Sequence, residues 1–233
     1  MQRKNNFNEI VNFLFEVGTA KNIVRSHHQV INWSNDTIAS HSFRVAIIGL
    51  ILANLEKVGK EDKSSSSSTE LQKEVKVRKR MKFSCDFAAA RVNEDKVLKM
   101  CLLHDLAELR TGDANFINKF YRVENEEKAI QDQWENIVGG KELISLLKEY
   151  NERKSKEAII AKDADILDQI FLQKEYLSHR PYDFKKWHTY HEKKLKTKSA
   201  LKIAQIVFKN ESINWVYDFA GLLKGNKKKK SQK

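Results

Sequence analysis

The chain contains very few residues that interrupt helices. Its 233 residues include one proline, Pro181, and eight glycines. Proline removes a backbone donor and glycine loses the most entropy on ordering, so both are disfavoured inside helices. Leu, Ile, Ala, Glu and Lys recur at helical spacing, and no alternating strand pattern extends beyond a few residues. The sequence therefore predicts an all-α protein.

Cysteines and long apolar runs are scarce as well. Cys85 and Cys101 lack the paired spacing of a zinc site, so we expect two reduced, partly buried side chains, although a disulfide between them is possible. The longest uncharged apolar stretch, Val45 to Leu55, is too short to cross a bilayer, and no signal peptide is evident near Met1. We therefore expect a cytoplasmic protein with no membrane partner.

The length and the hydrophobic content of 41% allow one substantial core. We expect a single domain over residues 1–223, a basic, serine-rich insertion at 57–82 and a disordered lysine-rich tail at 224–233. The expected helices are 7–18, 40–57, 92–109, 123–138, 141–150, 155–178, 183–195, 199–209 and 212–223.

Positive charge is concentrated in three segments. Residues 57–82, 185–209 and 224–233 carry +5, +7 and +6 of a net charge of +12, so the rest of the chain carries −6. Such segments can bind a phosphate backbone nonspecifically, and a nucleic-acid-binding protein is therefore the competing functional class. No nucleic-acid motif accompanies them, and we expect at most weak contact through the insertion and the tail.

Polar residues that suit a metal site interrupt three apolar helices. His104 and Asp105 lie in a Leu-rich run, His41 opens a strongly apolar helix, and Asp163 and Asp165 lie inside a third. A buried carboxylate needs a counter-charge, which a divalent cation supplies efficiently; the alternative is a hydrogen-bonded core pair. Two imidazoles and two carboxylates suit a first-row transition metal in a roughly octahedral site.

This order of residues resembles the HD-domain superfamily of metal-dependent phosphohydrolases. The segments His41 to Ala46, Leu103 to Glu108 with Thr111 to Asp113, and Ala161 to Leu167 resemble its 5'-deoxynucleotidase-like subgroup. The resemblance covers about residues 7–180 and implies a helical HD-domain bundle that hydrolyses nucleoside or deoxynucleoside 5'-monophosphates. It also implies one divalent cation, Mn, Co, Fe, Ni or Zn, and a homodimer.

The choice between Asp163 and Asp165 is open from the residues alone. Two positions apart on a helix, they point about 200° from one another, so one ion does not bind both. The helical wheel favours burial of Asp163, whereas the family pattern places its ligand at Asp165. The resemblance therefore implies the metal set His41, His104, Asp105 and Asp165.

Three further residues have expected roles. Glu108 lies three residues after Asp105 on the same helical face, so we expect it to orient the attacking water or to shuttle its proton. Asp113 is expected to assist proton transfer to the leaving group or to bind a sugar hydroxyl. The resemblance implies that Arg25 binds the substrate phosphate.

Other activities of the superfamily are alternatives to this function. These are hydrolysis of cyclic nucleotides or alarmones and metal-dependent nuclease activity. Versions with two metals need additional histidines. None lies between His41 and His104, and His188 and His191 are read as surface residues. The sequence therefore favours a site with one metal.

Overall fold

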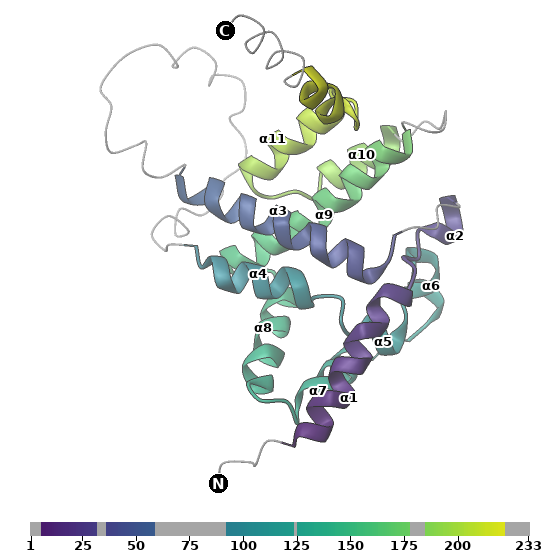
Figure 1. The fold of residues 1–233 in the computed structure, drawn as a ribbon, viewed down its shortest axis with the longest axis vertical. Coiled ribbons are helices and arrows are strands. Elements are labelled where there is room, and N and C mark those ends of the chain that lie inside the picture. Colours follow the sequence, from purple (N-terminus) through teal and green to yellow (C-terminus); the bar gives the residue numbers. More distant parts are fainter. Residues whose placement is uncertain (1–5, 32–35, 59–91, 124, 178–184, 222–233) are drawn as a thin grey trace, which may run out of the picture.

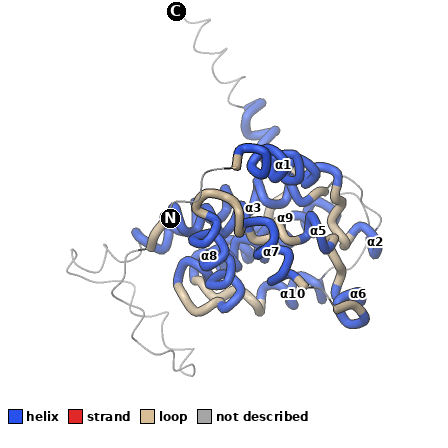
Figure 2. The backbone as a smooth tube through the Cα atoms, turned by 90° about the horizontal axis from the view of Figure 1, so that it is seen from below, coloured by secondary structure: helices blue, strands red, loops and turns tan. Residues whose placement is uncertain are grey.

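The computed structural model describes residues 6–31, 36–58, 92–123, 125–177 and 185–221 (Figure 1). In these residues the regular structure is helical, and the sole β pairing is an isolated antiparallel bridge between Val24 and Thr37 (Figure 2). The all-α prediction is confirmed. The tail at 224–233, Cys85 and nearly all of the insertion at 57–82 lie outside the described residues.

Most of the expected helices are present. The helices are α1 (Phe7–Gly18), the 3-10 helix η1 (Thr19–Asn22), α2 (His28–Ile31), α3 (Ile38–Val58), α4 (Glu94–Leu103), α5 (Glu108–Thr111), α6 (Phe116–Tyr121), α7 (Glu126–Trp134), α8 (Gly140–Glu152), α9 (Lys156–Leu177), α10 (Lys185–Glu192) and α11 (Lys198–Val207). Residues 214–221 are helical too. The short elements η1, α2 and α6 were not predicted, because an element of four to six residues is too short to show a helical period in its apolar residues.

The prediction of one helix over 92–109 is wrong. The chain turns at residues 104–107, between α4 and α5, where backbone N–H groups bond three residues back rather than four. Examples are Leu106 to Leu103 and Glu108 to Asp105. Every residue of this stretch suits a helix, so the break has no local signal. It turns the chain at the His-Asp pair.

The helices bury two apolar clusters, and the His-Asp turn joins them. The larger cluster is built from α3, α4 and α9, which pack on one another, with α8, α10 and α11 against α9. The smaller cluster includes Ile130, Trp134 and Leu147, and Phe13 of α1 packs edge-on against Trp134. Cys101 lies in the first cluster and Leu106 in the second. The four residues between them are therefore anchored on both sides.

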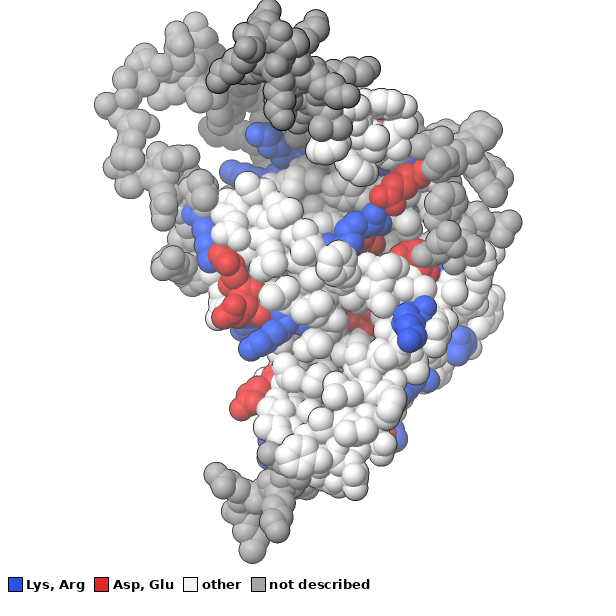
Figure 3. Space-filling view, in the orientation of Figure 1, with Lys and Arg blue, Asp and Glu red and all other residues white. Residues whose placement is uncertain are grey.

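Helix α3 is more apolar than its uncharged run suggests. The 20 residues Ile38–Lys57 are long and apolar enough to cross a membrane by length and composition alone. However, one face of α3 packs on α4 and α9, which is the environment of a core helix. The opposite face exposes Phe43, Ile47, Ile51 and Leu55. Much of the surface in Figure 3 is correspondingly uncharged, and its Lys and Arg side chains are scattered.

The C-terminal helices differ in how much apolar surface they expose. Ala200, Ala204 and Val207 of α11 are buried against the larger cluster, so this helix belongs mainly to the core. The following residues expose Trp215, Tyr217 and Phe219. Cys101 is buried and free, as expected.

Candidate metal centre

The backbone on either side of α2 brings Arg25 to the start of α3. Arg25 N donates to Asp36 O at 3.0 Å, and Ile38 N donates to Ile23 O at 3.0 Å. These bonds flank the Val24–Thr37 bridge and close the loop that contains α2. Arg25 therefore lies beside the first turn of α3, which carries His41.

Four predicted ligands converge from three helical segments. His41 Nε2 lies 3.3 Å from His104 Nε2 and 3.4 Å from one oxygen each of Asp105 and Asp165. His104 Nε2 lies 3.3 Å from Asp105 Oδ1 and 4.0 Å from Asp165 Oδ1. Two donors at right angles, each about 2.1 Å from an ion, are about 3 Å apart. The donor atoms of His41, His104 and Asp165 all lie within 4.8 Å of one another, so these three fit one small divalent cation. Asp105 lies beside them, and its Oδ2 is paired with Arg25.

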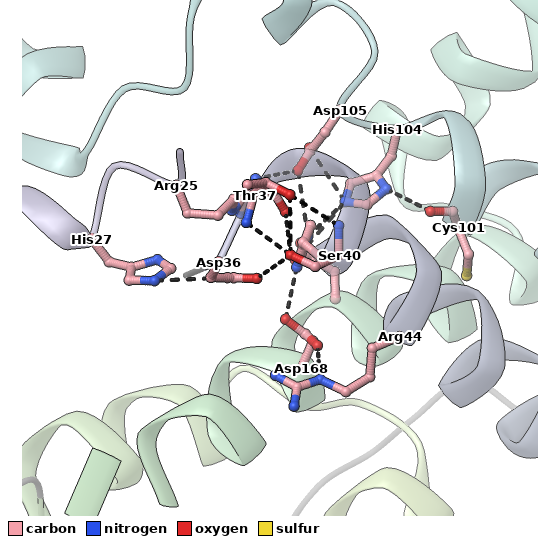
Figure 4. A network of polar contacts seen from close by, with 12 residues as sticks. Arg25, His27, Asp36, Thr37, Ser40, Arg44, Cys101, His104, Asp105 and Asp168 are labelled. Carbon is pink, nitrogen blue, oxygen red and sulfur yellow. Dashed lines mark hydrogen bonds and ion pairs between the residues drawn. The ribbon is translucent and has the colours of Figure 1, made fainter. Parts of the chain in front are cut away.

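Both histidine rings are oriented by their second nitrogen. His41 Nδ1 lies 2.7 Å from the Asp168 carboxylate. His104 Nδ1 lies 2.9 Å from the Cys101 carbonyl, as Figure 4 shows. Each acceptor favours a proton on Nδ1, so each Nε2 can offer its lone pair to a cation. This arrangement, together with the mixed nitrogen and oxygen donors, matches the chemistry of a transition-metal site.

The structure separates the two candidate carboxylates of α9. Asp165 Oδ1 faces the histidines, while its Oδ2 accepts from Lys162 Nζ at 2.5 Å. Asp163 instead lies at the start of α11, where it accepts from the backbone N–H groups of Lys196 and Thr197 and from the Thr197 hydroxyl at 2.7 to 3.1 Å. Asp163 is buried, as its position on the helical wheel indicates, but its partners are Lys196 and Thr197 rather than the two histidines.

Arg25 lies among three acidic side chains at the edge of this cluster. Its Nη1 is 2.5 Å from Asp105 Oδ2 and 3.3 Å from Glu108 Oε2, and its Nε is 3.3 Å from Asp113 Oδ2. Asp113 also accepts from the backbone N–H of Ser26 at 2.9 Å and from its hydroxyl at 3.0 Å. Glu108 and Asp113, the two residues expected to handle protons, therefore both contact Arg25 beside the cluster.

The carboxyl groups of the site differ in pKa because their neighbours differ. Burial and the charge of Asp105 raise the pKa of Glu108 to about 9, although Arg25 opposes this. Burial also acts to raise the pKa of Asp105, but the charges of His104 and Arg25 hold it well below its ordinary value. Likewise, Lys162 and His41 hold the pKa of the buried Asp165 well below the usual range.

The two imidazoles also differ. Burial lowers the pKa of His104. Burial and Arg25 act in the same direction on His41, but hydrogen bonds to Asp105, Asp165 and Asp168 raise its pKa well above the ordinary value.

Sequence reasoning missed several residues around the site. Asp168 contacts His41, and Lys162 contacts Asp165. The Tyr150 hydroxyl lies 3.5 Å from Asp165 Oδ2. The available signal was a third carboxylate in the apolar α9, one turn after Asp165. Tyr150 had no signal, because a Tyr at a core position of α8 is ordinary packing.

His188 and His191 do not form a second metal pair. The His188 ring stacks near Phe208 with centroids 3.5 Å apart. His191 Nδ1 lies 3.0 Å from the Gln173 amide and 2.9 Å from the Trp187 carbonyl. These contacts are local packing within α9, α10 and the end of α11, away from the four converging side chains.

A helical bundle with a cluster of two His and two Asp side chains in its interior is the arrangement of a metal-binding protein. The HD-domain family model matches residues 80–207, more than half of the chain. The protein belongs to the HD domain family. The matched span contains His104, Asp105 and Asp165, whereas His41 precedes it.

The chain is also similar to proteins named 5'-deoxynucleotidase HDDC2. It is 27% identical to that of Dictyostelium discoideum over 146 residues, which cover 60% of this chain and 63% of the relative. It is 34% identical to that of Homo sapiens over 98 residues, which cover 39% and 48%. The similarity therefore spans about half to two thirds of the length of these relatives.

Solved structures share the fold. The PH0347 protein from Pyrococcus horikoshii is 26% identical, with a TM-score of 0.58, over 84% of this chain and 97% of that one. A predicted metal-dependent phosphohydrolase from Magnetospirillum magnetotacticum is 18% identical with a TM-score of 0.58, over 93% and 97%. The latter likeness supports the fold alone.

Proposed function

We propose that the protein is a metal-dependent phosphomonoesterase that hydrolyses nucleoside or deoxynucleoside 5'-monophosphates to nucleoside and phosphate. The observation that carries this proposal is the convergence of four donor side chains beside Arg25. The names of the HDDC2 relatives support the substrate class.

His41, His104, Asp105 and Asp165 would hold one divalent transition-metal cation, which we propose to be Mn, Co, Fe, Ni or Zn. Such a cation, when bound, lowers the pKa of a water molecule and neutralises charge on a phosphoryl oxygen. The nitrogen and oxygen donor set fits any of these ions.

We assign proton handling to Glu108. Its side chain lies beside Arg25, and burial raises its pKa to about 9, so it retains a proton readily at neutral pH. A carboxyl group that is protonated at neutral pH can donate its proton to the leaving oxygen, and it can accept the proton of the attacking water only after it has ionised. Asp113, which we expect to assist this transfer, also holds the Arg25–Ser26 segment in place.

We assign phosphate binding to Arg25. A guanidinium is permanently charged, and its planar set of donors matches phosphate oxygens. Here Asp105, Glu108 and Asp113 fix its position next to the candidate metal ligands. A phosphate bound by Arg25 would therefore lie at the edge of the cluster where hydrolysis is proposed.

The test is phosphate release from a panel of ribo- and deoxyribonucleoside 5'-monophosphates. The full-length protein is stripped of metal and supplied in turn with manganese, cobalt, zinc or magnesium. We expect release that depends on the cation and is abolished by Asp105→Ala. Asp132→Ala is the matched control, because this carboxylate pairs with Lys128 on the surface of α7.

Equal release without added metal, or full activity of Asp105→Ala, would refute the proposal. If the folded wild type releases no phosphate with any of the cations, the assigned substrate class is wrong. The same protein would then be assayed with cyclic nucleotides, alarmones and nucleic acid.

We further propose a homodimer and weak, nonspecific nucleic-acid contact. The exposed Trp215, Tyr217 and Phe219 support an association surface, and the basic segments support the contact with phosphate backbones. Light scattering tests the first point, with a monomeric mass at all concentrations as the contrary result. Salt-dependent retention on RNA tests the second.

A further inference from the structure

Asp168 is a fully buried carboxylate whose two oxygens have different partners. It lies on α9, one turn after Asp165, and its side chain has no solvent exposure. Oδ2 accepts from His41 Nδ1 at 2.7 Å, and Oδ1 accepts from Arg44 Nε (Figure 4). Burial acts to raise the pKa of Asp168, but the contacts with His41 and Arg44 leave that pKa below its ordinary value.

Arg44 connects this carboxylate to the protein surface. It lies on α3, one turn after His41, and its Nη1 donates to Glu175 Oε1 at 2.6 Å. The side chain of Glu175 is 41% exposed, whereas that of Asp168 is 0% exposed. A buried charge is tolerated only with close partners, and Arg44 supplies the positive one here.

We propose that Asp168 is a positioning residue for His41, and that the Arg44–Glu175 pair holds Asp168 in the orientation this requires. Its hydrogen bond keeps a proton on His41 Nδ1 and turns Nε2 toward Asp105 and Asp165. A carboxylate partner also makes the ring a stronger donor to a cation than a neutral acceptor does.

His104 provides the contrast within the same site. Its Nδ1 faces the neutral Cys101 carbonyl at 2.9 Å, which fixes the ring without adding charge. The two imidazoles are therefore supported differently, and only His41 depends on a side chain that can be replaced. This makes the contribution of the carboxylate measurable.

The informative variant is Asp168→Asn. Arg44 Nε requires an acceptor, so the amide oxygen of Asn turns toward Arg44 and its NH₂ group toward His41 Nδ1. Two donors then face each other unless His41 moves its proton to Nε2, where it blocks cation binding. The variant thus changes hydrogen-bonding polarity at nearly constant shape.

Cation affinity is measured on the full-length protein by competition with a chromophoric chelator, using Zn²⁺ and Co²⁺. We expect Asp168→Asn to weaken binding by about 10- to 100-fold, as changes in the partners of metal-bound histidines do. The matched control is Asp163→Asn on the same helix, which contacts Lys196 and Thr197 instead and should alter affinity by less than about twofold.

A second measurement does not depend on the variant. In ¹⁵N NMR spectra of the Zn²⁺-loaded wild type, His41 should be metal-bound through Nε2 and protonated at Nδ1. Coordination through Nδ1, or unchanged affinity of a folded Asp168→Asn protein, would overturn the positioning role. The inference rests on the proposed metal site; if the wild type binds neither cation, that site itself is refuted.

Discussion

The assignment of Asp165 rather than Asp163 to the candidate metal site leads to opposite effects of two alanine substitutions. Asp163 accepts three hydrogen bonds at the start of α11, from two backbone N–H groups and the Thr197 hydroxyl. Asp165 points one oxygen at His41 instead. Asp163→Ala should therefore affect stability, and Asp165→Ala cation binding.

The magnitude of the first effect follows from those bonds. Asp163 has 1% exposure, and Asp163→Ala leaves the partly buried donors of Lys196 and Thr197 without their acceptor. A hydrogen bond to a charged group contributes about 1.5 to 3 kcal/mol, and the backbone donors at the helix start can partly recover water. We expect a loss of about 2 to 4 kcal/mol in the free energy of unfolding, which leaves a domain of ordinary stability folded.

The second effect appears in affinity. Asp165→Ala removes one of four donors, and we expect Zn²⁺ affinity to fall by more than the roughly 10- to 100-fold of an outer-shell change. In the metal-free protein Asp165→Ala should cost stability as well, because it removes the carboxylate that Lys162 and His41 contact, so cation affinity is the quantity that distinguishes the two variants. Urea unfolding and chelator competition measure the two quantities separately.

The opposite pattern would refute this reasoning. If folded Asp163→Ala lost cation binding while Asp165→Ala kept it, the ligand would be Asp163. The helical-wheel argument would then have identified the metal ligand, and the contacts of Asp163 with α11 would not describe the metal-bound protein.

Three further changes test the fold and the site. Gly49→Ala should destabilise the protein by about 1 to 3 kcal/mol in urea unfolding despite the better helix propensity of alanine, because a methyl group there would lie 2.5 Å from Cys101 Sγ. A stabilised variant would contradict the packing. Glu16→Gln should cost about 0.5 to 1 kcal/mol at neutral pH, since Glu16 accepts two bonds from Arg110. The Arg110 contact lowers the pKa of Glu16, so this difference is present in full above pH 4.5 and should shrink as acid protonates the group. A difference that does not fall as the pH is lowered below 4.5 would contradict it. Arg25→Met should lower the thermal unfolding midpoint of the metal-free protein, because it removes the guanidinium that three acidic side chains contact. Added Mn²⁺ should restore part of the loss. An unchanged midpoint would be contrary.

Several features of the fold could be predicted from the residues. The scarcity of Pro and Gly predicts helices, and the apolar periodicity places most of them within a few residues of their observed bounds. The break at His104–Ala107 could not be predicted. Each of its residues is compatible with a helix, and the turn arises because Cys101 and Leu106 pack into different clusters.

The candidate ligands could be named from the sequence because each is a polar residue in an apolar helix. The helical wheel favoured Asp163 and the family pattern favoured Asp165. The wheel could not decide which carboxylate faces the histidines, since α9 is covered by other elements on several sides and both carboxylates are buried. A helical wheel distinguishes a core face from a solvent face, so it carries little information for a helix that is buried on opposite sides. Only the neighbouring helices show which partner each carboxylate has.

The sequence by itself thus determined that the chain is helical and that His41, His104-Asp105 and an Asp of α9 interrupt apolar segments. The family resemblance pointed to Asp165 and Arg25, but only the tertiary structure shows that Asp165 faces the histidines, that Asp168 contacts His41, and that Arg25 lies among three acidic side chains. The physical reason is that helix formation and apolar patterning depend on near neighbours in the chain. Hydrogen bonds and charge pairs, in contrast, are made between residues as far apart as 143 positions.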